Sequence, residues 1–216
     1  MFSRSNRRIV FLSILVMLAL TLAGQGLQPL SIGIKDVPTG VSSMQSPTGF
    51  KDAPAIPNDS GIEGVQTFPD KAVYHIHVNS LPEPKGNIPP PFGQHYSYWQ
   101  NCGIYDQPVE LGNALHSMEH GAVWLTYRPN LDAGQVKALQ DLVRGHPYVL
   151  MSPYPPQTDD VVLTAWGVQL VIKSVPDDRI SKFIAYYALG PQTPERGAPC
   201  DGGIGVPLQQ NVSSSL

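Results

Sequence analysis

The stretch that decides the fold is residues 111–127, LGNALHSMEHGAVWLTY. If residues 111–120 form a helix, His116 and His120 are four residues apart and share one helix face. Gly121 is a typical helix stop, and residues 122–127 form an apolar run typical of a buried strand. Two imidazoles on one helix face are a common half of a transition-metal site. The sequence therefore predicts a helix–strand unit that carries a pair of metal ligands.

The flanking segments predict a small domain around this unit. Residues 72–78, AVYHIHV, alternate and predict a strand with His75 and His77 on one face. A proline-rich loop and an aromatic segment with His95 follow. Apolar spacing and turn residues then predict helices over 131–145 and 177–189, and strands over 148–153 and 161–172, the last bent at Gly167. We expect an α+β fold, with a small mixed or antiparallel sheet, two helices packed on one face and many loops.

The N-terminus predicts export. Arg4, Arg7 and Arg8 precede an apolar run over residues 9–24, which is typical of a signal peptide or a signal anchor. Cleavage and retention both stay open, and either would place the remainder outside the cytoplasm, secreted or anchored to the cytoplasmic membrane by residues 9–24. The predicted organisation is a signal or anchor (1–25), a flexible Pro/Gly/Ser-rich linker (26–66), a globular domain (67–191) and a mostly disordered tail (192–216).

Composition narrows the function classes. The chain has 216 residues, a net charge of -3, 22 prolines, 20 glycines and only 14% charged residues. This balance favours a loop-rich domain with a modest core, and the lack of basic excess argues against nucleic acid as a partner. The membrane is the one partner that the sequence indicates. Outside the cytoplasm, a disulfide between Cys102 and Cys200 becomes plausible; the alternative is that Cys102 is a metal ligand or a free thiol.

Several motifs, in order over about residues 70–190, resemble a bacterial family, domain-of-unknown-function family 3105. The chain carries His77-Val78, a PPFGQH segment over residues 90–95, a W-x-x-C-G-x-Y segment over residues 99–105 and HSMEHG over residues 116–121. Further matches are YRP (127–129), SPYP (152–155) and LTAWG (163–167). The chain departs from the family pattern at Pro91-Phe92, where small hydroxyl residues are expected, and at Met118, where Leu is usual. The resemblance implies domain boundaries but no established activity.

The first functional hypothesis is a metal site formed by His77, His95, His116 and His120, with copper favoured over zinc. Imidazole suits both metals, and a thioether from Met118 or Met151 would select copper(I). Met118 lies about 200° from His116 around a helix, so it can join the histidines only if this segment is extended. The competing interpretation is that these are ordinary, partly buried histidines.

Two other hypotheses stay open. Residues 116–120 match H-x-x-E-H, a zinc-peptidase signature in which Glu119 would be the base and a downstream glutamate the third ligand. Glu195 is the acidic residue at a suitable distance, although it lies in the predicted tail; Glu119 is otherwise expected to orient a histidine. The last hypothesis is a metal-free interaction domain that uses Tyr96, Tyr98 and Trp99, or these aromatics simply pack their own loop. Whether the protein is an enzyme stays open.

Overall fold

The computed structural model describes residues 50–208. The predicted signal peptide or anchor (1–25) lies outside the described residues, together with residues 26–49 and 209–216. Within the described range, no helix is both long and apolar enough to cross a membrane.

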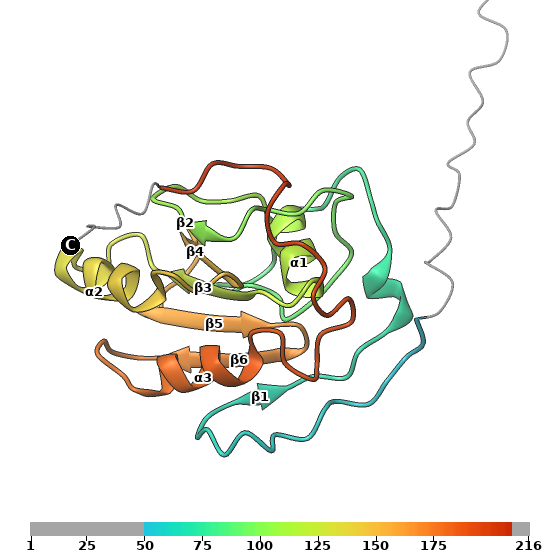
Figure 1. The fold of residues 1–216 in the computed structure, drawn as a ribbon, viewed down its shortest axis with the longest axis horizontal. Coiled ribbons are helices and arrows are strands. Elements are labelled where there is room, and N and C mark those ends of the chain that lie inside the picture. The colour runs from blue at the N-terminus through green and yellow to red at the C-terminus, as the bar shows by residue number, and fades with distance from the viewer. Residues whose placement is uncertain (1–49, 209–216) are drawn as a thin grey trace, which may run out of the picture. The chain divides into compact units, whose positions relative to one another are not determined.

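The centre of the domain is a six-stranded mixed sheet with the spatial order β1-β6-β5-β3-β4-β2 (Figure 1). β2 and β3 run parallel to β4, whereas β5 pairs with β3 and β6 in the antiparallel sense, as β1 does with β6. The strands are β1 (Gln66–Thr67), β2 (Gly103–Ile104), β3 (Val123–Tyr127), β4 (Val149–Pro153), β5 (Val161–Ala165) and β6 (Val168–Ile172). The predicted strand over residues 161–172 is a hairpin, because Gly167 adopts a φ of 70° at its turn. The mixed sheet with helices confirms the α+β prediction.

Three α-helices join the strands, and each falls within its predicted range. They are α1 (Leu111–Glu119), α2 (Ala133–Val143) and α3 (Arg179–Tyr187). The Asp132 side chain caps α2 by accepting hydrogen bonds from two backbone N–H groups. α1 ends one residue earlier than predicted, so His120 is its C-terminal cap.

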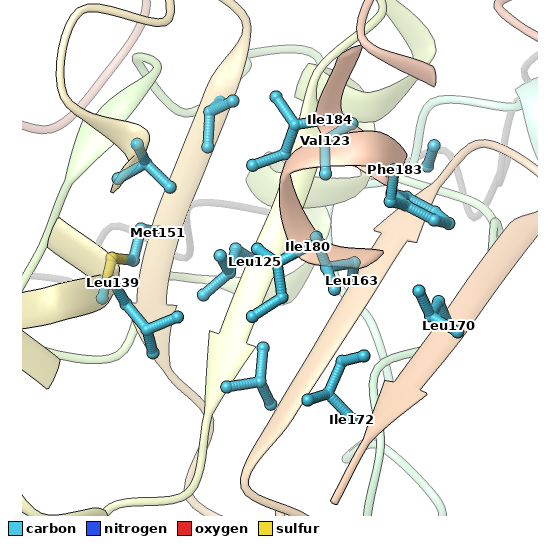
Figure 2. Close-up of a cluster of buried hydrophobic side chains, with 14 of the residues drawn as sticks. Val123, Leu125, Leu139, Met151, Leu163, Leu170, Ile172, Ile180, Phe183 and Ile184 are labelled. Atoms are coloured by element: carbon cyan, nitrogen blue, oxygen red, sulfur yellow. The ribbon is translucent and has the colours of Figure 1, made fainter. Parts of the chain in front are cut away.

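The two faces of the sheet carry different cores. Val123 and Leu125 of β3 belong to a cluster with apolar residues of α2 and α3, which Figure 2 shows with Ile180 and Phe183 over the strands. Trp124 points the other way and packs with α1, because side chains alternate along a strand. α2 and α3 therefore share one face, as predicted, while α1 lies on the opposite face. Each large apolar side chain buried here contributes about 1.5–3 kcal/mol.

The prediction of a strand over residues 72–78 is wrong. Ala72–His75 is instead a short 3-10 helix, η1, and only His77 makes an isolated bridge, to His95. Two hydrogen bonds favour this conformation: the backbone N–H of Ala72 donates to the carboxylate of the distant Asp52, and that of Tyr74 donates to the carbonyl of Lys71. These contacts outweigh the β preference of the alternating sequence. His75 and His77 consequently meet different partners.

The folded part extends beyond the predicted boundaries of 67 and 191 on both sides. Ile62, in the predicted linker, is buried in the cluster with α2 and α3, and Arg179 reaches back to the carbonyl of Glu63. Part of the predicted tail packs beside α1, where the chain after α3 returns across the domain (Figure 1). Cys200 is buried there. Backbone hydrogen bonds and a disulfide hold these segments in place. Such contacts need no regular spacing of apolar residues, so the sequence of these segments does not show that they are folded.

Candidate metal centre

α1 divides its buried side chains between a core face and a histidine face. Met118 is fully buried with Leu115 and Trp124 in the apolar cluster under the sheet. Because residues 111–119 are helical, the extended arrangement that would bring Met118 to the histidines is not formed. Met151 lies in the cluster on the other face of the sheet. The structure therefore brings neither predicted thioether to the histidines.

Four side chains from distant parts of the chain form the first group with metal-ligand spacing. His77, His95, His116 and Glu119 place one ligand atom each within 4.8 Å of the others. The bridge between two loops aligns the first two, because Val78 donates its N–H to the carbonyl of His95 at 2.8 Å. The ring centroid of His77 lies 5.0 Å from that of His95 and 5.0 Å from that of His116. His95, His116 and Glu119 are almost completely buried, and His77 is half-buried.

Backbone carbonyls orient three of the imidazoles in the same way. The Nδ1 atoms of His95, His116 and His120 lie 2.9, 2.7 and 2.6 Å from the carbonyl oxygens of Gly93, Tyr96 and Pro199, respectively. A carbonyl can only accept, so each Nδ1 carries the proton and donates it. In this tautomer the lone pair lies on Nε2, which is the nitrogen that can bind a metal. This arrangement is the usual support for histidines that bind a metal.

Two glycines make the helix fit this arrangement. A side chain at Gly112 would meet the ring of Tyr96 within 3 Å, so glycine lets Tyr96 lie against α1 and present its carbonyl to His116. Gly121 turns the chain from α1 into β3 with a φ of 114°, a backbone conformation that residues other than glycine rarely adopt. A Cβ at this position would also lie only 2.8 Å from the Leu189 side chain.

Glu119 is the centre of a buried charge network. Its Oε1 lies 2.5 Å from Nδ1 of His75, whose Nε2 lies 3.0 Å from Asp70. Trp166 also donates to Asp70, and the ring of His75 stacks on Phe50 at 3.8 Å. Glu119 thus orients a histidine, as expected, but that histidine is His75.

The network changes the protonation of both central groups. Burial alone would lower the pKa of His75, but its hydrogen bonds with Asp70 and Glu119 outweigh burial and raise the pKa from 6.5 to about 9. Burial would raise the pKa of Glu119, but the hydrogen bond from His75 and the nearby His95 ring lower it from 4.5 to about 2. At neutral pH, His75 is therefore an imidazolium between two carboxylates.

One buried nitrogen faces the carboxylate without making a hydrogen bond. Nε2 of His95 lies 2.8 Å from Oε2 of Glu119, but in the tautomer that donates from Nδ1 to Gly93 this nitrogen carries no proton and forms no hydrogen bond with the carboxylate. The His95 side chain is completely buried, and this nitrogen has no other hydrogen-bond partner in the described part of the chain. An unsatisfied buried nitrogen costs about 1–3 kcal/mol. A cation beside Nε2 and the carboxylate would satisfy both.

His116 is held in the neutral form that can bind a metal. Burial, together with the neighbouring His95 and His120 rings, lowers the pKa of His116 from 6.5 to about 4. Burial and His95 lower the pKa of His77 as well. Both rings therefore stay unprotonated at neutral pH, where their lone pairs are available.

His116 also belongs to a second group, with His120 and Glu195. Glu195 comes from the predicted tail, and its N–H donates to the carbonyl of Glu119 at 3.0 Å. Its Oε2 lies 3.5 Å from Nε2 of His120. From the sequence, Glu195 is a candidate only as a hydrolase ligand, and the pairing of Asp70 with His75 is not predicted. The two-residue spacing of His75 and His77 was the available signal, but it was assigned to one strand face.

The aromatic loop mostly packs against this centre. The ring of Trp99 lies 4.9 Å from His120 and 5.7 Å from His116, and its indole N–H donates to the carbonyl of Asp201. Tyr98 is exposed, whereas Tyr96 lies against α1. Of the three aromatics considered as a binding surface, two therefore serve the packing of the loop.

Cys102 and Cys200 form a disulfide. Cys102 also donates its backbone N–H to the carbonyl of Cys200 at 2.7 Å. The bridge ties the chain after α3 to the loop before α1, as predicted. Disulfides persist mainly in oxidising compartments, which hints at an extracellular location.

The metal-free domain is expected to be most stable near pH 6.5. The pKa of His116 falls on folding to about 4, so the unfolded chain binds more protons and stability is lost as pH drops from about 6.5 to 4. The pKa of His75 rises on folding to about 9, so its contribution is complete below about 6.5 and is lost as pH climbs to about 9. Each change is worth about 3 kcal/mol.

Urea unfolding of residues 42–216 with a chelator, between pH 4 and 9.5, measures this profile. The lowered pKa of Glu119 extends the acid loss below pH 4.5. His75→Gln should flatten the alkaline side and keep the loss between about pH 6.5 and 4 that comes from His116. Constant stability of the natural sequence between pH 6.5 and 9 would contradict the charge network.

Comparison with known proteins agrees with the resemblance. The family model described as "Protein of unknown function (DUF3105)" matches residues 86–202, more than half of the chain, and the chain belongs to this family. The match includes His95, His116 and Glu119 and both cysteines, but it begins after His77. No curated protein and no solved structure matches the chain.

Proposed function

We propose that this member of the DUF3105 family binds one transition-metal ion through His77, His95 and His116, next to Glu119. The observation that carries the proposal is the Nε2 of His95, which is buried, makes no hydrogen bond within the described residues and lies 2.8 Å from a carboxylate oxygen. A metal ion at this point would satisfy that nitrogen and the lone pairs of the other two rings at once. Imidazole and carboxylate are also common ligands of copper and zinc.

The alternative, that these histidines are structural, fits this group less well. A structural histidine normally uses both ring nitrogens for hydrogen bonds when it is fully buried. His75 does so, with Asp70 and Glu119. His95 does not, although it lies in the same buried layer. The contrast between the two rings supports a ligand role for His95.

We favour copper over zinc as the ion. Sites with nitrogen and oxygen ligands bind divalent copper more tightly than zinc in the usual order of affinities. Since Met118 and Met151 pack in the two cores, neither methionine of residues 50–208 adds a preference for copper(I). The proposed ion is therefore copper(II), held by three imidazole nitrogens with a carboxylate close by.

We further propose that the domain acts outside the cytoplasm, secreted or held at the membrane by residues 9–24. The disulfide and the basic–apolar N-terminal sequence support this location. N-terminal sequencing of the mature protein would separate a cleaved signal from a retained anchor. Reduced cysteines in protein taken from its natural compartment would argue against export.

Competition between the two metals tests the proposed ion. Residues 42–216, freed of metal, should take up Cu²⁺ from an equimolar mixture with Zn²⁺, and the copper EPR spectrum should show hyperfine coupling to several imidazole nitrogens. His95→Gln should weaken copper binding and reduce that coupling. Preferential uptake of zinc would contradict the copper assignment, and a nitrogen-poor spectrum would contradict the ligand set.

A zinc hydrolase is the second candidate, because Glu195 approaches His116 and His120 and completes the ligand set of an H-x-x-E-H enzyme. The base of that mechanism would be Glu119. Both oxygens of Glu119 are engaged by His75 and His95, and its pKa of about 2 makes it a weak base. Metal binding is therefore the better supported function. Zinc-dependent peptide hydrolysis that Glu119→Gln abolishes would reverse this order.

A further inference from the structure

His116 takes part in both groups of candidate ligands, and this shared position points to a path for the metal. We propose that the ion first binds at an outer position formed by His116, His120 and Glu195, and then moves to the inner position of His77, His95 and His116. The inference rests on the proposed function, because the inner position is the site proposed there. It adds a second binding position and a role for His120 and Glu195.

The ligand side chains of the two positions differ in their exposure to solvent. At the inner position, the His95 side chain is 0% and that of Glu119 2% exposed, so a hydrated ion meets little of either. At the outer position, the Glu195 side chain is 42% exposed. A solvated carboxylate can exchange with the water around an ion before the ion leaves solution. His120, 4% exposed behind it, offers the next ligand inward.

The outer atoms already have the spacing of two ligands on one ion. Nε2 of His120 and Oε2 of Glu195 are 3.5 Å apart, which is long for a charge-assisted hydrogen bond. Two neighbouring ligand atoms about 2.0–2.1 Å from one ion are about 2.9 Å apart in a square-planar arrangement and about 3.3 Å apart in a tetrahedral one. The ring centroids of His116 and His120 are 4.5 Å apart, so the third ligand is adjacent.

A single nitrogen of His116 must serve both positions. Its Nδ1 donates to the carbonyl of Tyr96, which leaves only Nε2 for a metal. One lone pair cannot bind two ions, so the positions are alternatives for one ion and not two halves of a dinuclear centre. The ion keeps its bond to His116 while it exchanges Glu195 and His120 for His77 and His95.

The direction of movement follows from the ligands. The outer position offers two imidazoles and one exposed carboxylate, whereas the inner position offers three imidazoles beside a buried carboxylate. Attraction between a cation and a carboxylate is stronger where water is excluded. The inner position therefore binds more tightly, and the outer position mainly governs how fast the ion arrives.

The chain holds the outer residues in place independently of any ion. Glu195 is hydrogen-bonded through its backbone to Glu119, and Gly197 donates to the carbonyl of His120 at 3.3 Å. The carbonyl of Pro199 fixes the ring of His120, and the disulfide follows at Cys200. The outer position is thus preformed, as a loading site requires.

The test measures both the rate of Cu²⁺ uptake and the affinity for Cu²⁺ in the full chain, with and without the substitution Glu195→Gln. Stopped-flow uptake of Cu²⁺ should slow by about tenfold or more, while the equilibrium Kd changes by less than about threefold. Glu83→Gln, which removes an equally negative exposed side chain in another loop, should leave both unchanged. The natural chain should bind one ion, not two.

The outcomes separate this inference from the proposed function. Uptake by Glu195→Gln at the natural rate would overturn the path and leave the inner site intact. An equal loss of affinity and rate would also overturn it, because Glu195 would then be a ligand of the final site. Two ions per chain would refute the sharing of His116. A natural chain that binds no copper would refute the proposed function itself.

Discussion

Replacing His116 and His120 together by alanine is expected to abolish copper binding to the folded domain, with a loss of affinity of at least about 100-fold. His116 contributes to both groups of candidate ligands, and its Nε2 is the one nitrogen that they share. Without it, the inner group keeps two imidazoles, and the outer group keeps only Glu195. Isothermal titration with Cu²⁺ measures the affinity.

The single variants divide this loss between the two residues. His116→Ala alone should lose nearly as much affinity as the pair, whereas His120→Ala should mainly slow uptake. His146→Ala is the matched control, because His146 is exposed and belongs to neither group. Unchanged copper affinity in the double variant, with an intact fold by circular dichroism, would reject these histidines as ligands.

The second large effect is expected in Glu119→Gln, which should destabilise the metal-free domain by about 3 kcal/mol or more. This change removes the charge that faces the buried imidazolium of His75 and leaves that cation with Asp70 alone. The shape of the side chain is nearly kept, so the loss reports on charge. Urea unfolding at pH 6.5 in a chelator measures it.

Glu110→Gln is the control for this change, because Glu110 is exposed and precedes the same helix. It should alter the free energy of unfolding by less than about 0.5 kcal/mol. The Glu119→Gln variant should also show a smaller alkaline fall in stability, because only Asp70 is then left to raise the pKa of His75. A loss no larger than that of Glu110→Gln would contradict the buried charge network.

The elements with regular periodicity were predictable from sequence. Residues 111–127 carry both a helical repeat and a glycine stop, and they form α1 and β3 nearly as predicted. The same helical geometry correctly separated Met118 from the histidines once the helix was assigned. Local spacing suffices for α1 because its hydrogen bonds join near neighbours, and for β3 because an apolar run after a helix stop is typical of a buried strand.

The parts that depend on distant contacts were not predictable in this way. The alternating segment around His75 predicts a strand, but Asp52, Asp70 and Glu119 hold it in another conformation. Glu195 lies 75 positions after His120, and only the bonds after α3 bring the two together. The sequence shows that such residues exist, but their partners follow from the tertiary fold.

The measurement that tests the central claim most directly is the metal content of residues 42–216, purified without a histidine tag from an oxidising compartment. Elemental analysis by mass spectrometry should find close to one copper ion per chain, and His95→Gln should lower that copper content strongly. A domain that contains no transition metal, and binds none when copper is added back, would contradict the account and leave His77, His95 and His116 as structural residues.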